Sequence, residues 1–247
     1  MELKDFFNEN KSVALGFSGG VDSSYLFYAA DKYGADIKAY FVKTAFQPEF
    51  ELRDAEKIAG QIGAEMAVIE LDILADEKIT SNPAKRCYYC KQKIFGAIQA
   101  QAVKDGCELI IDGSNVSDDE DDRPGMKAIR ELSVRSPLRE YGITKDEVRK
   151  RSEEVGLFTW DKPAYACLAT RIPTGQIITK DILTRIEVAE DHLFELGFSD
   201  FRVRVMGDIA KLQVPKDQMH HMLNKHEAVL AAIKPYFKTV LLDMEGR

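Results

Sequence analysis

The sequence contains no hydrophobic run approaching the roughly 18 residues that a membrane-spanning helix needs, no internal repeat and no low-complexity segment. Its first residues carry neither a basic flank nor an apolar signal core. Cysteine is scarce, with four residues in 247, so a disulfide framework is excluded for a chain of this length. We therefore expect a cytoplasmic protein without membrane contact, whose cysteines serve metal or thiol chemistry.

Blocks of lysine and arginine are also missing, and the formal net charge is −7. A general nucleic-acid binder uses basic side chains to neutralise phosphates, so stable nucleic-acid binding is disfavoured and small molecules are favoured as ligands. The only charge run, residues 118–122, is acidic. We expect this run to be solvated, with a magnesium or ribose contact as the less favoured alternative.

Apolar, strand-like segments alternate with amphipathic, helix-like segments in the first half of the chain. The expected strands are 12–17, 37–42, 66–71 and 109–111, and the expected helices are 23–33, 50–62 and 88–103. This alternation predicts βαβ units and an α/β fold with a parallel sheet covered on both faces. In such sheets, ligands bind beyond the carboxyl ends of the strands.

The pattern changes near residue 160. Before it, a capped helix is expected from Thr144 to about residue 155. Beyond it, the sequence predicts a loop over 162–175, a helix over 180–196, paired strands over 201–206 and 210–214, a helix over 217–233 and a short strand over 239–242. We expect an α/β domain over residues 1–160 and a smaller α+β domain over 161–247, and 247 residues suffice for two cores.

Glycine and serine are concentrated directly after the first expected strand, in Ser18-Gly19-Gly20-Val21-Asp22-Ser23. Paired glycines let backbone amides converge on phosphate oxygens, serine hydroxyls add donors, and the following helix contributes its positive end. A plain serine-capped turn would explain neither the doubled glycine nor the Asp and Ser behind it. The Gly-Lys-Ser/Thr ending of phosphoryl-transferring P-loops is absent. The motif therefore predicts a polyphosphate ligand other than that of a P-loop kinase.

SGGVDS resembles the PP-loop of the ATP pyrophosphatases, which split ATP between its α and β phosphates. The resemblance implies that Ser18, Gly19, Gly20 and Ser23 hold the leaving pyrophosphate. It implies that Asp22 helps to place Mg²⁺. Ser114, in the turn after the fourth expected strand, is assigned to the same nucleotide site.

Two cysteines stand three residues apart, Cys87 and Cys90, so in a helix both thiols lie on one face. Cys167, far away in sequence, would add a third thiolate, and three thiolates can hold a [4Fe-4S] cluster with one iron open. Zinc would need a fourth ligand and is the second choice, since all four histidines lie in the C-terminal helices. A redox or merely buried pair of thiols is a further alternative. Cys107 is predicted to be a core residue.

Further motifs extend the resemblance over nearly the whole chain. They stand in the order found in the LarE family, the ATP-dependent sulfur transferases of nickel-pincer nucleotide synthesis: SGGVDS, DGSN (112–115), RPG (123–125), SPL (136–138), KP (162–163) and CLATRIP (167–173). The resemblance implies adenylylation of the carboxylates of a nicotinate-derived pyridinium mononucleotide and their conversion to thiocarboxylates. It also implies a homo-oligomer and a sulfide donor.

LarE-like proteins differ in their sulfur source. Some have only the cysteine that matches Cys167 and spend its sulfur, forming dehydroalanine, whereas others carry three cysteines. With Cys87 and Cys90 beside Cys167, this sequence is similar to the second kind, in which sulfide on the open iron of the cluster is passed on. Cys167 and Asp22 are the expected catalytic residues.

Arginines mark the expected substrate site. Arg202 and Arg204, at i and i+2 on an expected strand, project from one face, which suits phosphate or carboxylate but would also fit an exposed strand face. The resemblance assigns both to the substrate phosphate and places Arg171 and Glu190 in the same site. Read alone, Arg171 could bind an anion, favour a thiolate or lie at the surface.

Two rival functions use the same fold. A PP-loop tRNA thiolase would activate a base in place of a carboxylate and can also use a three-cysteine cluster, but the acidic net charge opposes tRNA binding. A nucleotide-binding module would bind ATP without turnover, and it would release no pyrophosphate.

Overall fold

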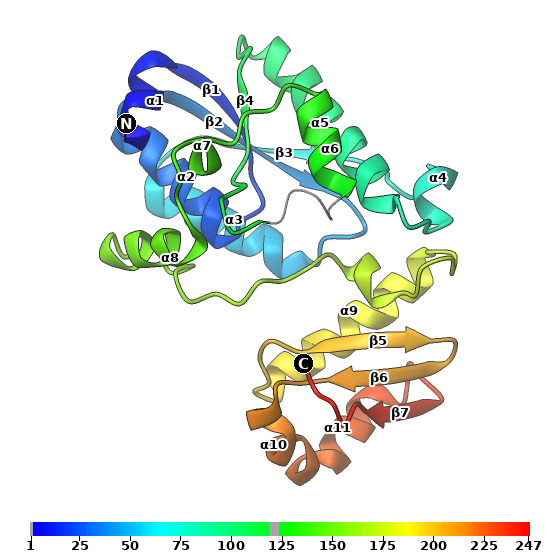
Figure 1. The fold of residues 1–247 in the computed structure, drawn as a ribbon. Coiled ribbons are helices and arrows are strands. Elements are labelled where there is room, and N and C mark those ends of the chain that lie inside the picture. Colours follow the sequence, from blue (N-terminus) through cyan, green and yellow to red (C-terminus); the bar gives the residue numbers. More distant parts are fainter. Residues whose placement is uncertain (1, 119–123) are drawn as a thin grey trace. The chain divides into compact units, whose positions relative to one another are not determined.

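The computed structural model describes residues 2–118 and 124–247, which form two compact units (Figure 1). The first unit comprises Met1–Ile73 and Lys85–Lys162, and the second comprises Leu74–Ala84 and Pro163–Arg247. Arg123 of the RPG motif and residues 119–122 of the acidic run lie outside the described residues. The segment Leu74–Ala84 belongs to the second unit, although the chain on both sides of it belongs to the first. No sequence pattern predicted this exchange between the units.

The first unit is built on a four-stranded parallel sheet. Its strands are β1 (Ser12–Gly16), β2 (Asp36–Lys43), β3 (Met66–Glu70) and β4 (Ile110–Ile111), in the order β3-β2-β1-β4. A single parallel bridge between Ile111 and Arg135 continues the pairing beside β4. The α/β fold with a parallel sheet is thus confirmed, and β1 and β2 are nearly continuous apolar runs because both of their faces are buried.

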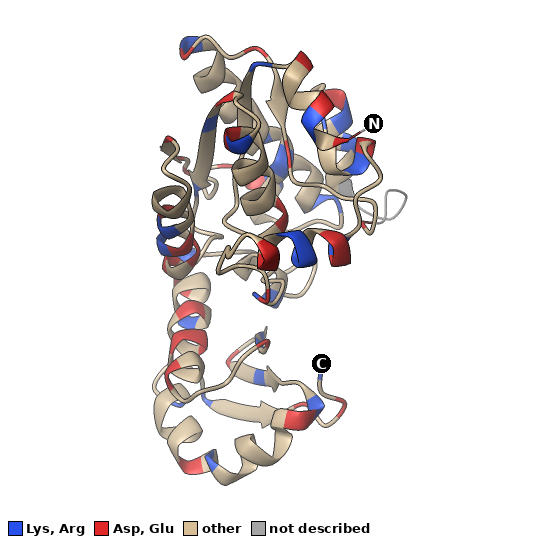
Figure 2. Cartoon of the chain, turned by 90° about the vertical axis from the view of Figure 1, so that its left-hand side faces the viewer, with Lys and Arg blue, Asp and Glu red and all other residues tan. Residues whose placement is uncertain are grey.

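Helices cover both faces of this sheet (Figure 1). One face shares a hydrophobic cluster with α1 (Leu3–Glu9), α2 (Val21–Lys32), α3 (Glu49–Ile62), α7 (Pro137–Glu140) and α8 (Lys145–Glu154). The other face shares a second cluster with α5 (Arg86–Lys104) and α6 (Pro124–Glu131). Cys107 is buried in this second cluster, which confirms it as a core residue. Acidic and basic side chains are interspersed on the helices (Figure 2).

The second unit packs a three-stranded sheet against α9 (Lys180–Glu195). Strands β5 (Arg202–Met206) and β6 (Ile209–Gln213) form the predicted antiparallel pair, and β7 (Thr239–Leu242) joins β6 in parallel. The remaining helices are α4 (Glu77–Thr80), η1 (Leu168–Arg171), η2 (Lys216–Gln218), α10 (Met219–Asn224) and α11 (His226–Ile233). Within the described ranges, every helix is too short or too polar to cross a membrane.

The helix predicted over 217–233 is wrong in one respect, because it is interrupted. Lys225 ends α10 and precedes α11 with φ −100° and ψ 13°, outside the helical region. Its Nζ donates to the carbonyl of Leu196 at 2.9 Å, at the end of α9. This tertiary contact, invisible in the local pattern, divides the segment into two short helices.

Asn82 holds the segment Leu74–Ala84 in the second unit. Its side chain is 1% exposed, and its Nδ2 donates to the carbonyl of Pro173 at 2.8 Å. In return, the amides of Gly175 and Ile178 donate to the carbonyls of Asn82 and Thr80, each at 2.8 Å. The segment is therefore joined by backbone and side-chain bonds to the loop that follows η1.

Candidate functional site

Two turns meet at the carboxyl edge of the parallel sheet. Gly19, between β1 and α2, has φ 69°, and a Cβ there would lie 3.2 Å from the Cβ of Ala55. Gly113, after β4, is closer still to its neighbour, since a Cβ would lie 2.8 Å from the amide nitrogen of Ser23. The turn after β4 therefore packs directly against the first turn of α2, and only glycine permits this approach.

Hydroxyl groups organise the SGGVDS loop. The Oγ of Ser23 accepts from the amide of Ser18 at 3.3 Å and lies 3.1 Å from the Oγ of Ser18. The amide of Gly20 donates to the Oγ of Ser18 at 3.3 Å. Ser23 is buried whereas Ser18 is exposed. The loop is thus preformed, with an exposed hydroxyl beside the N-terminus of α2, an arrangement suited to an anion.

Asp22 lies half-buried in the first turn of α2, and both of its carboxylate oxygens have partners. The Nδ2 of Asn115 donates to Oδ1 at 3.0 Å, and the Nζ of Lys145 forms an ion pair with Oδ2. Sequence reasoning missed both partners. Lys145 is 123 positions away along the chain, so no local signal marks the pair; Asn115 could have been inferred, since it follows a neighbouring strand.

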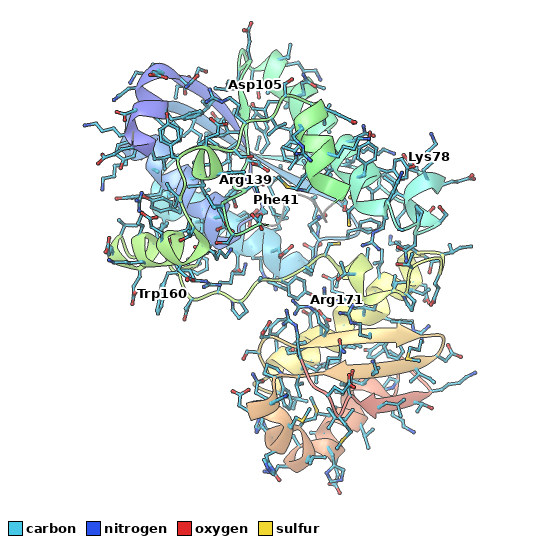
Figure 3. The ribbon with its side chains drawn as sticks, in the orientation of Figure 1. Phe41, Lys78, Asp105, Arg139, Trp160 and Arg171 are labelled. Carbon is cyan, nitrogen blue, oxygen red and sulfur yellow. The ribbon has the colours of Figure 1, made fainter. Side chains whose placement is uncertain are left out.

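The turn after β4 is organised by Asp112, which is 5% exposed. Its carboxylate accepts from the amide of Ser114 at 3.2 Å, from the Oγ of Ser114 at 2.7 Å and from the Oγ of Ser136 at 2.6 Å. Ser114 thus uses its amide and hydroxyl hydrogens inside the turn. Arg139, labelled in Figure 3, donates to the carbonyls of Asn115 at 3.0 Å and Asp118 at 2.7 Å. These bonds hold the shape of the edge around Asp22.

In the second unit, Arg171 and Glu190 form an ion pair that is almost completely buried, with side chains 0% and 1% exposed. The Nε and Nη2 of Arg171 each donate to one carboxylate oxygen of Glu190 at 2.9 Å. Glu190 also accepts from the amide of Val203 at 2.9 Å and from the hydroxyl of Tyr165. The pair therefore joins η1, α9 and β5, a tertiary arrangement that sequence reasoning did not identify.

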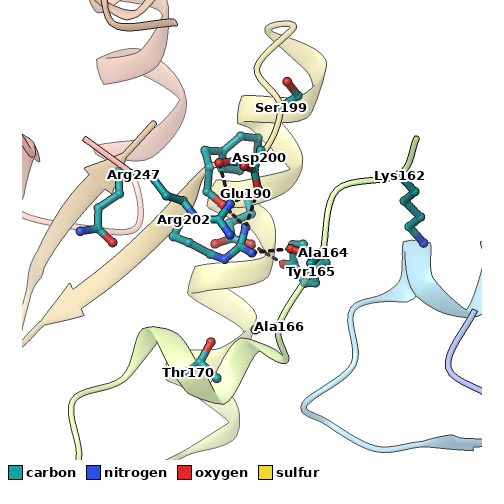
Figure 4. Close-up of polar contacts among 12 residues, drawn as sticks. Lys162, Ala164, Tyr165, Ala166, Thr170, Glu190, Ser199, Asp200, Arg202 and Arg247 are labelled. Carbon is teal, nitrogen blue, oxygen red and sulfur yellow. Dashed lines mark hydrogen bonds and ion pairs between the residues drawn. The ribbon is translucent and has the colours of Figure 1, made fainter. Parts of the chain in front are cut away.

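The guanidiniums of Arg202, labelled in Figure 4, and of Arg204 interact electrostatically with this pair. The Nη2 of Arg202 donates to the carbonyl of Ala164 at 2.8 Å, and its Cζ lies 5.2 Å from the centroid of the Tyr165 ring. Arg204 donates through Nη1 to the carbonyl of Thr170. Both side chains reach from β5 to the segment that contains Cys167. Arg171, Arg202 and Arg204 are called the arginine cluster below.

The arginine cluster carries more positive charge than Glu190 neutralises. Burial lowers the pKa of Arg202, and the charge of Arg171 lowers it further; the same two causes lower the pKa of Arg204. At Arg171, burial opposes the charge, but the hydrogen bonds and charge of Glu190 outweigh it and raise the pKa. A bound anion would relieve the repulsion among these guanidiniums.

Arg204 is held by a second chain of contacts. Its Nε donates to the Oε1 of Gln213 at 2.8 Å, and the Nε2 of Gln213 donates to the Oδ2 of Asp243 at 2.7 Å. Lys211 and Gln213 together lower the pKa of Asp243 to about 2, so this carboxyl is ionised at neutral pH. The direction of the Gln213 amide, and with it the position of the Arg204 guanidinium, is therefore fixed.

The three cysteines expected in a metal site belong to different units. Cys87, exposed, and Cys90, half-buried, lie in the first unit, in the first turns of α5, which begins two residues before the helix expected over 88–103. Arg86 donates to the Sγ of Cys87 at 3.8 Å. Cys167, half-buried, is the N-cap of η1 in the second unit. Among the described residues, no three His, Cys, Asp or Glu side chains form a group that could hold a metal ion.

Removing Glu190 is expected to destabilise the protein strongly. Glu190→Ala leaves the Arg171 charge buried without its partner, which typically costs about 3–5 kcal/mol. Glu195→Ala is the matched control, because it removes an exposed carboxylate from the same helix and should cost under about 1 kcal/mol. Urea unfolding followed by far-UV circular dichroism measures both. Equal losses in the two variants would contradict the structural role of the buried pair.

The chain is similar to known proteins over most of its length. A family model described as asparagine synthase matches residues 7–97. An uncharacterised protein of Synechocystis sp. is 37% identical over 99% of this chain and 92% of its own. Pyridinium-3,5-bisthiocarboxylic acid mononucleotide synthase of Lactiplantibacillus plantarum is 32% identical over 99% of this chain and 88% of its own.

The chain belongs to the LarE family. A tRNA-specific 2-thiouridylase, MnmA, of Thermotoga petrophila is also similar, 26% identical over 67% of this chain and 58% of its own. The LarE family and these relatives share the PP-loop fold, which confirms the fold read from SGGVDS. The chain is accordingly an ATP-dependent, sulfur-transferring enzyme.

Proposed function

We propose that the protein converts the carboxylates of a pyridinium mononucleotide to thiocarboxylates for the nickel-pincer nucleotide. The observation that carries this proposal is the nearly full-length similarity to the synthase of L. plantarum. A homo-oligomer and a sulfide-donating partner also belong to the proposal, and they follow from the family resemblance alone.

The first half of the reaction activates a carboxylate. A carboxylate oxygen of the substrate attacks the α-phosphorus of ATP, the bond to the bridging oxygen of the β-phosphate breaks, and pyrophosphate leaves. Ser18 and the amides at the start of α2 would bind the departing pyrophosphate, because they are donors gathered at the positive end of a helix. The product is an acyl-adenylate, in which AMP is a good leaving group.

Asp22 fits a role in holding Mg²⁺. Its carboxylate is the ligand type that magnesium prefers, it lies at the loop, and Asn115 fixes one of its oxygens at 3.0 Å. When bound there, Mg²⁺ would neutralise charge that develops on the pyrophosphate. Asn115 would keep the carboxylate oriented toward the loop.

In the second half, sulfide attacks the acyl carbon, the carbon–oxygen bond to AMP breaks, and a thiocarboxylate forms. We propose that Cys87, Cys90 and Cys167 hold a [4Fe-4S] cluster, which would supply an open iron able to carry the sulfide. The donor set fits such a cluster in kind and number. Cys87 and Cys90 are neighbours at i and i+3 on α5, close to the positive end of the helix and to Arg86.

The arginine cluster and Glu190 would position the substrate. A guanidinium offers five N–H donors, and Arg202 donates to two carbonyls, those of Phe201 and Ala164. The cluster combines this donor capacity with three positive charges, of which Arg171 is paired with Glu190 and Arg202 lies 4.0 Å from Asp200, and this arrangement suits the phosphate of a mononucleotide. Glu190 would position Arg171 and would not bind the substrate directly, because its carboxylate is already engaged in the buried pair.

Replacing both strand arginines tests the substrate half of the proposal. Arg202→Ala/Arg204→Ala should weaken binding of the pyridinium mononucleotide by about 10²-fold or more, because each charge-assisted hydrogen bond contributes about 1.5–3 kcal/mol. ATP binding should hardly change. Titration calorimetry with each ligand measures the effect, and Lys234→Ala, an exposed cation in the same unit, is the control. Equal loss of both ligands would move the arginines to the nucleotide site.

The reaction itself separates the proposed function from its rivals. With ATP, Mg²⁺, sulfide and the pyridinium dicarboxylate mononucleotide, the protein should form AMP, pyrophosphate and a thiocarboxylate detected by mass spectrometry. Salt-sensitive binding of tRNA with thiolation of a base would instead favour the thiolase function that the MnmA relative performs. Binding of ATP without pyrophosphate release would indicate a nucleotide-binding module.

A further inference from the structure

The ion pair between Lys145 and Asp22 lies beside the proposed nucleotide site, and a contribution to the stability of the fold does not explain why it is there. It lies at the SGGVDS loop, and its side chains are 31% and 21% exposed. An ion pair of this exposure contributes little to stability, typically under about 1 kcal/mol. Asp22 is the carboxylate proposed above for Mg²⁺, and Lys145 engages the oxygen that Asn115 leaves open. The ammonium therefore stands where a divalent cation would bind.

The backbone of Lys145 is fixed although its side chain can move. Lys145 is the first residue of α8, and the Oγ1 of its N-cap, Thr144, accepts from the amide of Glu147 at 3.3 Å. The amide of Lys145 donates to the Oγ of Ser117 at 3.0 Å. The amide of Val116 donates to the carbonyl of Ile143, two residues before α8, at 3.1 Å. These bonds tie the start of α8 to the turn after β4.

The side chain, in contrast, has a flexible four-carbon stem that ends in a compact charge with three donors. If Mg²⁺ takes the Oδ2 of Asp22, the ammonium loses its partner but stays at the edge of the loop. ATP keeps a net negative charge after one Mg²⁺ has bound, so the phosphates provide a new partner within reach of the same residue. Negative charge on the leaving phosphates grows as pyrophosphate departs, and a cation positioned there stabilises it.

We propose that Lys145 exchanges partners during the reaction: it neutralises Asp22 in the empty site and binds the triphosphate of ATP once Mg²⁺ occupies Asp22. Lys145 is then a catalytic residue of the adenylylation half and a competitor of Mg²⁺ in the absence of nucleotide. This inference rests on the proposed function only for the use of ATP with Mg²⁺. It does not depend on which carboxylate is activated.

The two roles predict opposite shifts in one variant. Without nucleotide, Lys145→Met should bind Mg²⁺ up to about five-fold more tightly, because the competing cation is gone. At saturating Mg²⁺, the same variant should bind α,β-methylene-ATP, which cannot be split between its α and β phosphates, at least about ten-fold more weakly. Lys145→Arg should restore much of the nucleotide affinity, since the charge is kept.

Isothermal titration calorimetry of the full chain, first with Mg²⁺ alone and then with α,β-methylene-ATP, measures both shifts. Lys150→Met, an exposed lysine on the same helix, is the matched control and should behave as wild type. If Lys145→Met does not fold, Lys145→Gln removes the charge and keeps a donor. Weaker or unchanged Mg²⁺ binding, or unchanged nucleotide binding, overturns the proposal. No pyridinium substrate is present, so a failure of the proposed function in the turnover assay remains a separate result.

Discussion

Asp22→Ala should reduce the formation of AMP and pyrophosphate to below about 1% of the wild-type rate, since loss of one preorganised electrostatic group commonly costs about 10²–10³-fold. The carboxylate lies half-buried in the first turn of α2 at the sheet edge, outside the hydrophobic clusters, so the fold should survive. Thermal unfolding and a pyrophosphate-release assay on the same preparation measure both effects. Asp31→Ala, which removes an exposed acid from the same helix, is the control.

Ser18→Ala should also abolish the adenylylation step, because it removes the exposed hydroxyl of the loop and the acceptor of the Gly20 amide at 3.3 Å. Both variants should retain the pyridinium substrate, which is proposed to bind at the arginine cluster. Wild-type rates in either variant would remove SGGVDS from the nucleotide site. A collapse of the thermal transition in Asp22→Ala would instead assign the carboxylate a structural role.

The second large effect concerns the cysteines. Replacing Cys87, Cys90 or Cys167 by alanine should remove the brown chromophore of the anaerobically reconstituted protein and all sulfur transfer, because three thiolates are the minimum for the proposed cluster. Cys107→Ser is the control. Cys107 is buried in the hydrophobic cluster that the sheet shares with α5, so this variant should keep the chromophore. Visible spectra with iron and sulfide analysis measure the outcome.

Turnover separates this mechanism from a sacrificial one. With ATP, Mg²⁺, sulfide and substrate under anaerobic conditions, the wild-type protein should exceed one turnover with unchanged polypeptide mass, and oxygen should inactivate it. Dehydroalanine at position 167 after a single turnover would show that the protein spends its own sulfur. A colourless protein holding zinc would also contradict the cluster. Neither result would affect the adenylylation half.

The sequence predicted the elements whose pattern is local. The strands β1, β2 and β3 are apolar runs bounded by polar residues, and α8 starts at the capping residue Thr144 as expected. The β5–β6 pair is likewise centred on its Gly207-Asp208 turn. These features depend on periodicity, caps and turns, which a single sequence displays.

Features that depend on distant contacts were missed. The Lys145 partner of Asp22 and the buried pair of Arg171 with Glu190 require the folded chain to bring the residues together. In sequence, Arg171 lies within the expected loop 162–175 and could as well be at the surface; in the structure it is among the largest completely buried side chains. The burial of Arg171 could not be predicted from its own position, because it depends on pairing with the carboxylate of Glu190, 19 positions away.

The insertion of Leu74–Ala84 into the second unit has a consequence for the order in which the protein can fold on the ribosome. This segment is synthesised before the loop that Asn82 binds, and residues 85–162, about half of the first unit, are made in between. Ile79 is 0% exposed in the finished fold, but the loop to which its segment bonds is not yet made when it is synthesised. Nascent chains expose this segment at least until residues 173–178 are made, and a fragment that ends at Lys162 lacks these partners altogether.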